Sequence, residues 1–237
     1  MAAGVPTSVP ATAARAAAAA TGQVLGVALG ALGRVRRGRS LHPRGTVHEA
    51  VLTVWGAERP WGVPLLDRAG EHRCVVRVSR AAGLPPPLPD ARGLALRLEE
   101  PTGTVDLLVS TTGVGPLTRF VLIPRRTERR PMTSLLPVRT PTGALQLRLT
   151  PVAPDGAART WLLSAARGRG PWEPVGRLVA TAQPVRPDPD PPLRFDPVRH
   201  LPAGVSQYPW VRLVRDPAYV RSRQWSPSSR WRRRPGA

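Results

Sequence analysis

Short apolar runs separated by Gly and Pro fill the middle of the chain. In residues 145–149 (Leu-Gln-Leu-Arg-Leu) apolar and polar positions alternate, as in a strand with one buried and one solvated face. No segment of helical period lies between the runs. Eight strands are predicted, at 47–55, 73–79, 93–98, 104–110, 120–123, 144–150, 160–165 and 176–182. Many short strands with turns between them favour an antiparallel barrel or sandwich in a mainly β (α+β) protein.

The segments before the predicted strands have a different composition. Residues 1–14 are rich in Ala, Pro and Thr and are predicted to form a disordered lead. Residues 15–38 are predicted to form an Ala-rich helix. The uncharged stretch 16–33 is long enough to span a membrane, but its alanines and glycines give only a weak drive into lipid. We favour a helix packed on the domain over a strong membrane anchor. With no compact cleavable signal before it, we expect a cytoplasmic protein.

The predicted barrel domain occupies 39–183 and is followed by a strap. In 184–192 alternate prolines forbid helix and sheet pairing, so this segment is predicted to be extended. Asp216-Pro217 resembles a helix N-cap followed by proline at the first helical position, which predicts a short helix to about Gln224. The strap and helix together span 184–225. Residues 226–237 are predicted to form a basic disordered tail.

Arginine dominates the charge of the chain. The sequence has 35 Lys+Arg against 15 Asp+Glu, a formal charge of +20, and contains neither Lys nor Asn. Together with abundant Ala, Pro and Gly, this bias is typical of a high-GC genome. Because the arginines are spread along the chain, we expect no specific nucleic-acid partner. A binder that acts through the Arg-rich tail is an alternative.

Several kinds of chemistry have no support in the residue pattern. The single cysteine, Cys74, lies in an apolar run and excludes an internal disulfide framework and a cysteine-based zinc site. The histidines do not have zinc-site spacing, and no G-x-S-x-G elbow or phosphate loop occurs. The cluster 110–112 beside Arg119, Arg125 and Arg126 has two interpretations, a site for an anionic substrate or a polar strand end.

A more specific pattern lies in residues 39–123. Residues 76–83 read VRVSRAAG, 89–98 read PDARGLALRL and 105–108 read VDLL. These segments resemble the V-R-F-S-x-x-x-G, R-D-P-R-G-F-A-V-K-F and W-D-L stretches of the haem-dependent catalases, in the same order and at similar spacing. Upstream, RSLHPRG at 39–45 is similar to that family's R-V-V-H-A-K/R-G. The resemblance implies an antiparallel catalase-like β-barrel with an N-terminal helix and a short C-terminal helix.

The resemblance also implies roles for individual residues. His42 falls on the distal histidine, which removes and returns a peroxide proton. Ser79 falls on the serine that holds that imidazole. Arg39 and Arg77 fall on arginines that bind haem propionates, since a planar guanidinium can form two parallel bonds with a carboxylate. For His42 the alternative is an exposed histidine before a strand.

On the distal side, the chain departs from the family at one position. The family's distal asparagine would lie at Ser110 or Thr111, and this chain has no asparagine. A hydroxyl at either position can still donate a hydrogen bond to peroxide. The departure nevertheless puts catalatic efficiency in doubt.

The axial position is suggested by spacing alone. The family ligates iron through a tyrosine in R-x-x-x-Y, and Arg215 and Tyr219 have that spacing. If the helix begins at Pro217, Arg215 lies outside it, and Arg223 becomes the positive neighbour of Tyr219. The alternative for Tyr219 is a core tyrosine of a short docking helix.

These residues imply a haem-binding protein with peroxide-related oxidoreductase activity, acting on a small peroxide-like substrate. The chain is far shorter than a typical catalase, which indicates a minimal or degenerate relative whose activity is weak or lost. One alternative is a haem-free binding or scaffold protein on the same fold. Another is a phosphodiesterase-type hydrolase, for which the sequence offers no metal-ligand set. Homo-oligomerisation is left open.

Overall fold

The computed structural model describes residues 45–84, 87–127, 129–152, 158–185, 193–213 and 215. The predicted lead at 1–14, the helix at 15–38 and the tail at 226–237 lie outside these residues. So do 186–192 of the predicted extended segment and the predicted helix from Asp216 to about Gln224. The named elements are β1 (Gly45–Val54), α2 (Pro64–Asp67), β2 (Gly70–Arg80), β3 (Arg92–Glu100), β4 (Gly103–Thr111), η1 (Thr118–Phe120), β5 (Met132–Thr133), β6 (Val138–Thr140), β7 (Gly143–Pro151), β8 (Arg159–Arg167) and β9 (Glu173–Ala180).

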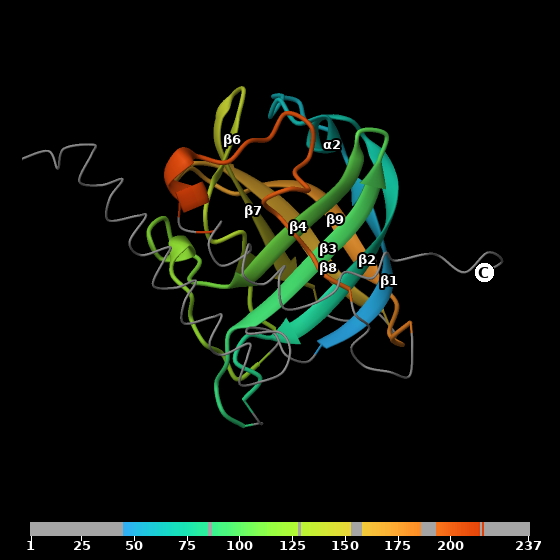
Figure 1. The fold of residues 1–237 in the computed structure, drawn as a ribbon, viewed down its shortest axis with the longest axis vertical. Helices are drawn as coiled ribbons and strands as arrows, with labels where there is room; N and C mark the ends of the chain where they lie inside the picture. The colour runs from blue at the N-terminus through green and yellow to red at the C-terminus, as the bar shows by residue number, and fades with distance from the viewer. Residues whose placement is uncertain are drawn as a thin grey trace, which may run out of the picture.

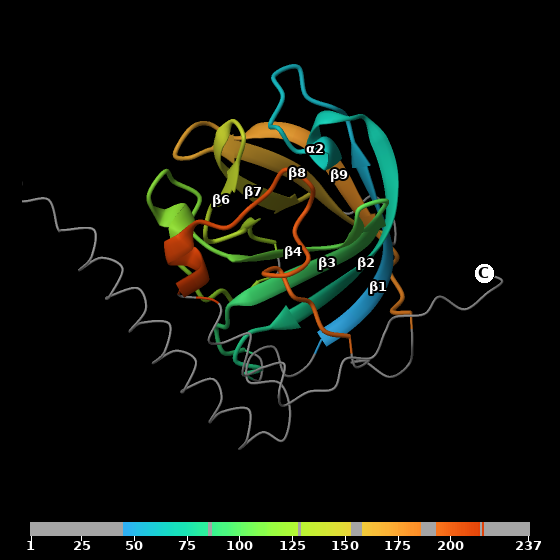
Figure 2. The same ribbon diagram turned by 45° about the horizontal axis from the view of Figure 1, so that its top comes forward.

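Eight of the strands close into an antiparallel barrel (Figures 1 and 2). The order β4-β3-β2-β1-β9-β8-β7 is continuous. The two-residue β5 then pairs with β4 through Ser110 and Thr111, and with β7 through Arg148 and Leu149. β6 pairs only with β7 among the strands, as a hairpin beside the ring. The predicted antiparallel barrel is therefore confirmed.

The barrel interior is filled by alternate residues of each strand. Leu96 of β3 lies between Val76 of β2 and Leu107 of β4, and residues two positions away continue the same inward face. Most of these side chains are buried in one core cluster, which also includes Trp161 of β8. Burial of apolar surface stabilises a fold by about 25 cal/mol per Å². The intervening positions face outward and are free to carry polar groups.

The strands predicted from residues 47, 73, 93, 104, 144, 160 and 176 are confirmed as β1, β2, β3, β4, β7, β8 and β9. The strand predicted at 120–123 is wrong. A tight loop turns the chain there: Gly113 N donates to Thr118 O, and Arg119 N donates to Gly115 O. A Cβ on residue 113 would collide with the Thr118 side chain, so the loop requires glycine there. A single bridge, Thr112 to Leu122, remains.

A helix that was not predicted begins at Pro209, and residues 209–213 and 215 are helical. The predicted helix from Asp216-Pro217 to about Gln224 lies outside the described residues. Arg212 N donates to Tyr208 O, and Pro209 stands at the start of the helix, where a missing N–H costs nothing. Arg215 is therefore helical.

Residues 193–208, called the strap from here on, precede this helix, and 193–200 cross the outer face of β3 and β4 (Figures 1 and 2, orange to red). The buried carboxylate of Asp106 holds it. Arg97 forms a two-pronged ion pair with Asp106 at 2.7 and 2.6 Å, while Asp196 N and His200 Nδ1 each reach the same carboxylate at 2.7 Å. Arg97 also donates to the carbonyl of Arg194. One carboxylate thus fixes the strap to the barrel.

Within the described ranges, no helix is long and apolar enough to cross a membrane.

Candidate functional site

One transverse row of outward-facing residues runs around the barrel near one end of its strands. Strand register pairs its members in sequence across seven strands, so their side chains share the outer face. We call this set the outer-face row: Gly45, Ser79, Gly93, Ser110, Thr133, Arg148 and Ser164. It contains glycines, hydroxyls and one guanidinium, and no apolar side chain. The outside of the barrel is therefore polar at this level.

The row brings together two of the residues singled out in the sequence. Ser79 of β2 pairs with Gly93 of β3, and Gly93 pairs with Ser110 of β4. Ser79 is buried and Ser110 half-buried. The Ser79 hydroxyl lies 3.5 Å from the Gly93 carbonyl. With glycine between them, no side chain of β3 separates the two hydroxyls within the row.

Arg77 lies two residues before Ser79 and faces the same side. Its side chain is buried, with 5% of the residue exposed. The guanidinium folds against Gly45, because a Cβ on residue 45 would lie 2.8 Å from its Cζ. Glycine at position 45 therefore makes room for the Arg77 head group. A buried guanidinium beside the row can pair with a carboxylate.

The structure separates the two candidates for the distal amide position. The alternation of β4 places Ser110 outward with Ser79, whereas Thr111 falls in the inward set. Thr111 is buried, and its hydroxyl accepts a hydrogen bond from Arg92 N at 3.0 Å. Its oxygen thus supports the start of β3. Ser110 is the one of the two that lies on the candidate face.

The loop that leads into β3 is organised by Asp90. Its carboxylate accepts hydrogen bonds from Ala82 N and Leu84 N at 3.0 and 3.1 Å and lies 3.5 Å from Arg80 Nε. Burial raises the pKa of Asp90, but the two backbone donors and Arg80 outweigh it, so the pKa is lowered overall. Asp90 therefore stays ionised and holds the loop that precedes β3, the strand that carries Gly93.

Four of the predicted site residues lie outside the described residues. These are Arg39, His42, Tyr219 and Arg223. Arg215 is described, and its Nη2 donates to the carbonyl of Ser134 at 3.3 Å. Ser134 follows Thr133, the neighbour of Ser110 in the outer-face row. Arg215 therefore lies near the β5 section of the row and not beside Arg77.

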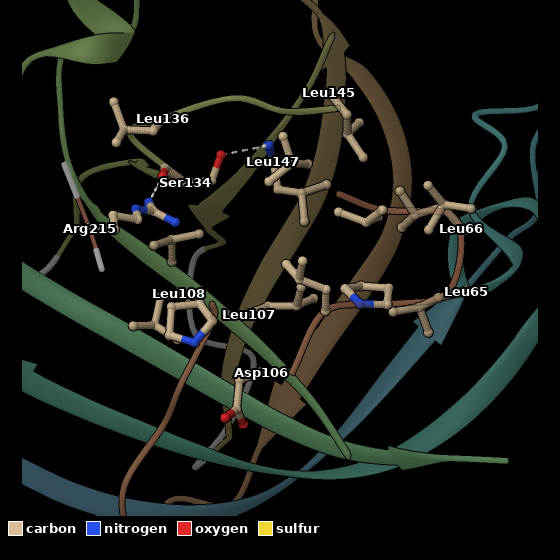
Figure 3. Close-up of a pocket in the computed structure, with 17 residues that line it drawn as sticks. Leu65, Leu66, Asp106, Leu107, Leu108, Ser134, Leu136, Leu145, Leu147 and Arg215 are labelled. Carbon is tan, nitrogen blue, oxygen red and sulfur yellow. Dashed lines mark hydrogen bonds between the residues drawn. The ribbon is translucent and has the colours of Figure 1, made fainter. Parts of the chain in front are cut away.

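Arg215 also borders a small apolar cavity (Figure 3). Because β5 is only two residues long, β4 and β7 are bridged only at one level. The strap and the loop after β5 cover the remaining gap, leaving a cavity of about 60 Å³. Leu65 and Leu66 of α2 line the side opposite Arg215. Ligand pockets usually measure about 300–1,000 Å³, so a porphyrin does not fit this cavity.

One cluster of side chains was not predicted from the sequence. Arg119, Arg148 and Trp172 come from η1, β7 and the loop before β9, and both guanidiniums lie within 5 Å of the indole ring centre. The sequence marked Arg119 only as a neighbour of the hydroxyl cluster at 110–112. Nothing local links it to Arg148 or Trp172. The folded barrel brings them together, with Thr133 pairing with Arg148 and donating to the Arg119 carbonyl.

A scan against protein-family models and a search of curated protein sequences found no match to the chain. Solved structures do match. A fungal catalase aligns with TM-score 0.58 at 14% identity, covering 82% of this chain and 60% of that chain. A bacterial catalase aligns with TM-score 0.58 at 13% identity, covering 82% and 59%. Catalase A from Saccharomyces cerevisiae aligns with TM-score 0.59 at 12% identity, covering 82% and 62%.

This chain spans only about three-fifths of the length of those catalases, and identity at this level speaks for the fold alone. The closed eight-stranded barrel and the alignment over 82% of the chain agree with the motif order read from the sequence. The protein therefore has the catalase-like β-barrel fold.

Proposed function

We propose that the protein binds haem against the outer face of β1–β4 and uses it in a peroxide-related oxidoreductase reaction. The observation that carries the proposal is the register Ser79–Gly93–Ser110. It aligns two hydroxyls on one face, beside the buried Arg77 guanidinium. The sequence resemblance suggested these same residues for the distal side and a propionate partner.

The residues present fit the group in charge and hydrogen bonding. Haem carries two carboxylates, and the planar guanidinium of the buried Arg77 can form two parallel hydrogen bonds with a carboxylate. Arg39 is proposed as the second partner. The close approach of Arg77 to Gly45 fixes its head group near the row. Tyr219 would hold the haem iron through its phenolate oxygen, with Arg215 or Arg223 as the positive neighbour that favours the phenolate form.

Bound haem would supply the redox chemistry of peroxide turnover. The side chains of the chain would handle protons and orientation. His42, with an imidazole that titrates near neutrality, is proposed to accept a proton from peroxide and to return it. The Ser79 hydroxyl would hold that imidazole in one orientation. The Ser110 hydroxyl would donate a hydrogen bond to peroxide in place of an amide.

One observation favours a haem-free binding or scaffold protein instead. Leu193 and Phe195 of the strap pack with Val47 and Val75 on the same outer face. Val75 lies four residues before Ser79, about 13 Å along the strand. Val47 pairs with Arg77, about 7 Å from the row, so the strap's contacts extend to the level of Arg77. If haem binds, it lies nearer the strand ends, at the level of Ser79. In the haem-free alternative, polypeptide covers the whole of this outer face.

Titration of the purified full chain with haemin distinguishes the two. The proposal predicts a shifted Soret band at one haem per chain. Arg77→Gln should weaken haemin binding about tenfold, the cost of one charged hydrogen-bonded contact. Arg73→Gln is the matched control, because Arg73 lies on the same strand and face but is exposed. Equal haemin affinity in the two variants would contradict the proposed role of Arg77.

A further inference from the structure

Two arginines and a tryptophan form a compact group on the outside of the barrel. The Cζ of Arg119 lies 4.4 Å from the centre of the Trp172 ring, and the Cζ of Arg148 lies 4.7 Å from it. Arg119 is buried, with 3% of the residue exposed, while Arg148 and Trp172 are half-buried. Arg148 belongs to the outer-face row. We call these three residues the Arg–Trp–Arg cluster.

The cluster has many donors and few acceptors. Arg119 donates to the carbonyls of Gly170 at 3.1 Å and Gly115 at 3.4 Å, and Arg148 donates to the Ser164 hydroxyl at 3.5 Å. Arg148 Nε and Trp172 Nε1 are buried with no hydrogen-bond partner. In the part of the chain that the structure describes, neither guanidinium forms an ion pair with a carboxylate. One buried and one half-buried cation therefore lie together, with no carboxylate of the described residues paired to either.

The backbone holds this arrangement in place. The Thr133 hydroxyl, one position from Arg148 in the outer-face row, donates to the carbonyl of Arg119 at 2.9 Å. The turn that carries Arg119 is closed by its own hydrogen bonds, as described for the loop from residue 113. These hydrogen bonds fix the backbone of Arg119 against the barrel. Its proximity to Arg148 therefore does not depend only on the conformations of two long side chains.

Burial and mutual repulsion disfavour the positive charges of Arg119 and Arg148. Burial lowers the pKa of Arg119. Burial lowers the pKa of Arg148 as well, and the charge of Arg119 lowers it further. The indole faces offset part of this cost through cation–π attraction. In a purely structural cluster, buried donors normally have hydrogen-bond partners and buried charges are paired with opposite charges. This cluster has unpaired buried donors and two like charges.

We propose that the Arg–Trp–Arg cluster binds a tetrahedral oxyanion of the phosphate type, either free phosphate or the phosphate group of a small molecule. Guanidinium groups from two elements can each give paired hydrogen bonds. A phosphate group offers at least three oxygens and nearly two negative charges to the two cations, whereas a carboxylate offers two oxygens and one charge. Trp172 Nε1 and the Ser164 hydroxyl supply further donors. The anion would enter from the side on which Arg148 and Trp172 remain partly exposed.

The site is separate from the proposed haem chemistry, and the experiment uses the haem-free full chain. Thermal unfolding is followed in phosphate, acetate and chloride at equal pH and ionic strength. Phosphate at ten times its dissociation constant should raise the midpoint by about 3 °C or more over chloride, and acetate should raise it less. Equal midpoints in phosphate and chloride would overturn the proposal. A rise in acetate as large as in phosphate would overturn the tetrahedral assignment.

Matched variants separate the site from general effects of phosphate on a basic protein. Arg177→Gln removes the same charge from an exposed position of β9 and should keep the phosphate-dependent rise. Arg148→Gln should lose most of it, yet be at least as stable as the wild type in chloride, because a buried like-charge repulsion is gone. Retention of the full rise in Arg148→Gln would contradict the site.

Trp172→Phe provides a second test should Arg148→Gln not fold. Phenylalanine keeps an aromatic ring against both guanidiniums and removes only the Nε1 donor. Phosphate affinity, measured by calorimetry, should fall about fivefold to tenfold, in line with one lost hydrogen bond to a charged group. Unchanged affinity would remove Trp172 from the site.

Discussion

Ser79 and Ser110 lie in one row across the outer face of the barrel, two strands apart, with only Gly93 between them. Neighbouring strands are about 4.8 Å apart, so the two backbones are about 10 Å from one another. A molecule placed over Gly93 can meet both hydroxyls. The pairing joins residues 31 positions apart in the sequence and defines the face on which the candidate chemistry is built.

Ser110→Asn should increase peroxide turnover by the haem-loaded protein. An amide at this position restores the donor that the resemblance expects and reaches farther than a hydroxyl. We expect a severalfold rise in the rate of oxygen release from hydrogen peroxide, with haemin affinity unchanged. Thr111→Asn is the control, because residue 111 falls in the inward set; an equal gain there would contradict the assignment of the outer face.

Asp106→Asn should release the strap from the barrel. The substitution leaves the nearly buried guanidinium of Arg97 without its counter-ion and weakens the contact with His200. Breaking a buried pair on one side costs about 3–5 kcal/mol, so the free energy of unfolding in urea should fall by about that amount. Hydrogen exchange should quicken most in 193–200.

Glu99→Gln controls for loss of a carboxylate on the same sheet. Glu99 is exposed and accepts a hydrogen bond only from Thr104 among the described contacts. Its removal should change the free energy of unfolding by less than about 1 kcal/mol. A similar loss in both variants would argue against Asp106 as the anchor of the strap.

His48 should make the barrel less stable as the pH falls below neutrality. Its ring is buried; Nδ1–H donates to Thr181 O at 2.8 Å, which leaves Nε2 to accept from the Thr46 hydroxyl at 3.0 Å. Burial lowers the pKa of His48 below its ordinary value of 6.5; the Thr181 carbonyl opposes this, and the charge of Arg159 adds to it. The folded state therefore prefers the neutral ring.

Between that lowered pKa and 6.5 the unfolded chain binds more protons, so stability is present above 6.5 and falls as the pH drops through this range. The slope is at most about 1.4 kcal/mol per pH unit for one proton. Urea unfolding at several pH values should show a shallower slope in His48→Gln than in the wild type. An identical slope would exclude His48 as the source.

Cys74 should be inert in the folded protein. Burial raises the pKa of its thiol to about 12, against a smaller opposing effect of the Leu52 backbone. At pH 8 almost no thiolate is present to react. A thiol reagent should modify one group per chain rapidly in denaturant and only very slowly under native conditions; rapid native labelling would contradict burial in the barrel.

The pattern of apolar and polar residues predicted most barrel strands, because alternation with a period of two arises when one face of a strand is buried. It failed where local signals were absent. β5 has only two residues, too few to alternate, yet it closes the barrel. At 120–123 an apolar run mimicked a strand, while the glycine turn at residue 113 directed the chain into η1. The helix that begins at Pro209 was not predicted, and the helix start predicted at Asp216-Pro217 lies outside the described residues.

The motif order singled out Ser79 and Ser110, which the strand register places in one row, while their roles stay predictions. The parity of β4 was enough in principle to choose Ser110 over Thr111, since the apolar positions 105, 107 and 109 mark the inward set. The association of Arg148 with Arg119 and Trp172 had no such signal. It depends on how three distant segments meet, which only the closed barrel specifies.

The absorption spectrum of the full chain reconstituted with haemin reports directly on haem binding. We expect a tyrosinate-type spectrum at one haem per chain, abolished in Tyr219→Phe and kept in Tyr208→Phe, the change at the other tyrosine of the chain. No Soret shift in the wild type would contradict haem binding. A tyrosinate spectrum that survives Tyr219→Phe would contradict the proposed axial ligand.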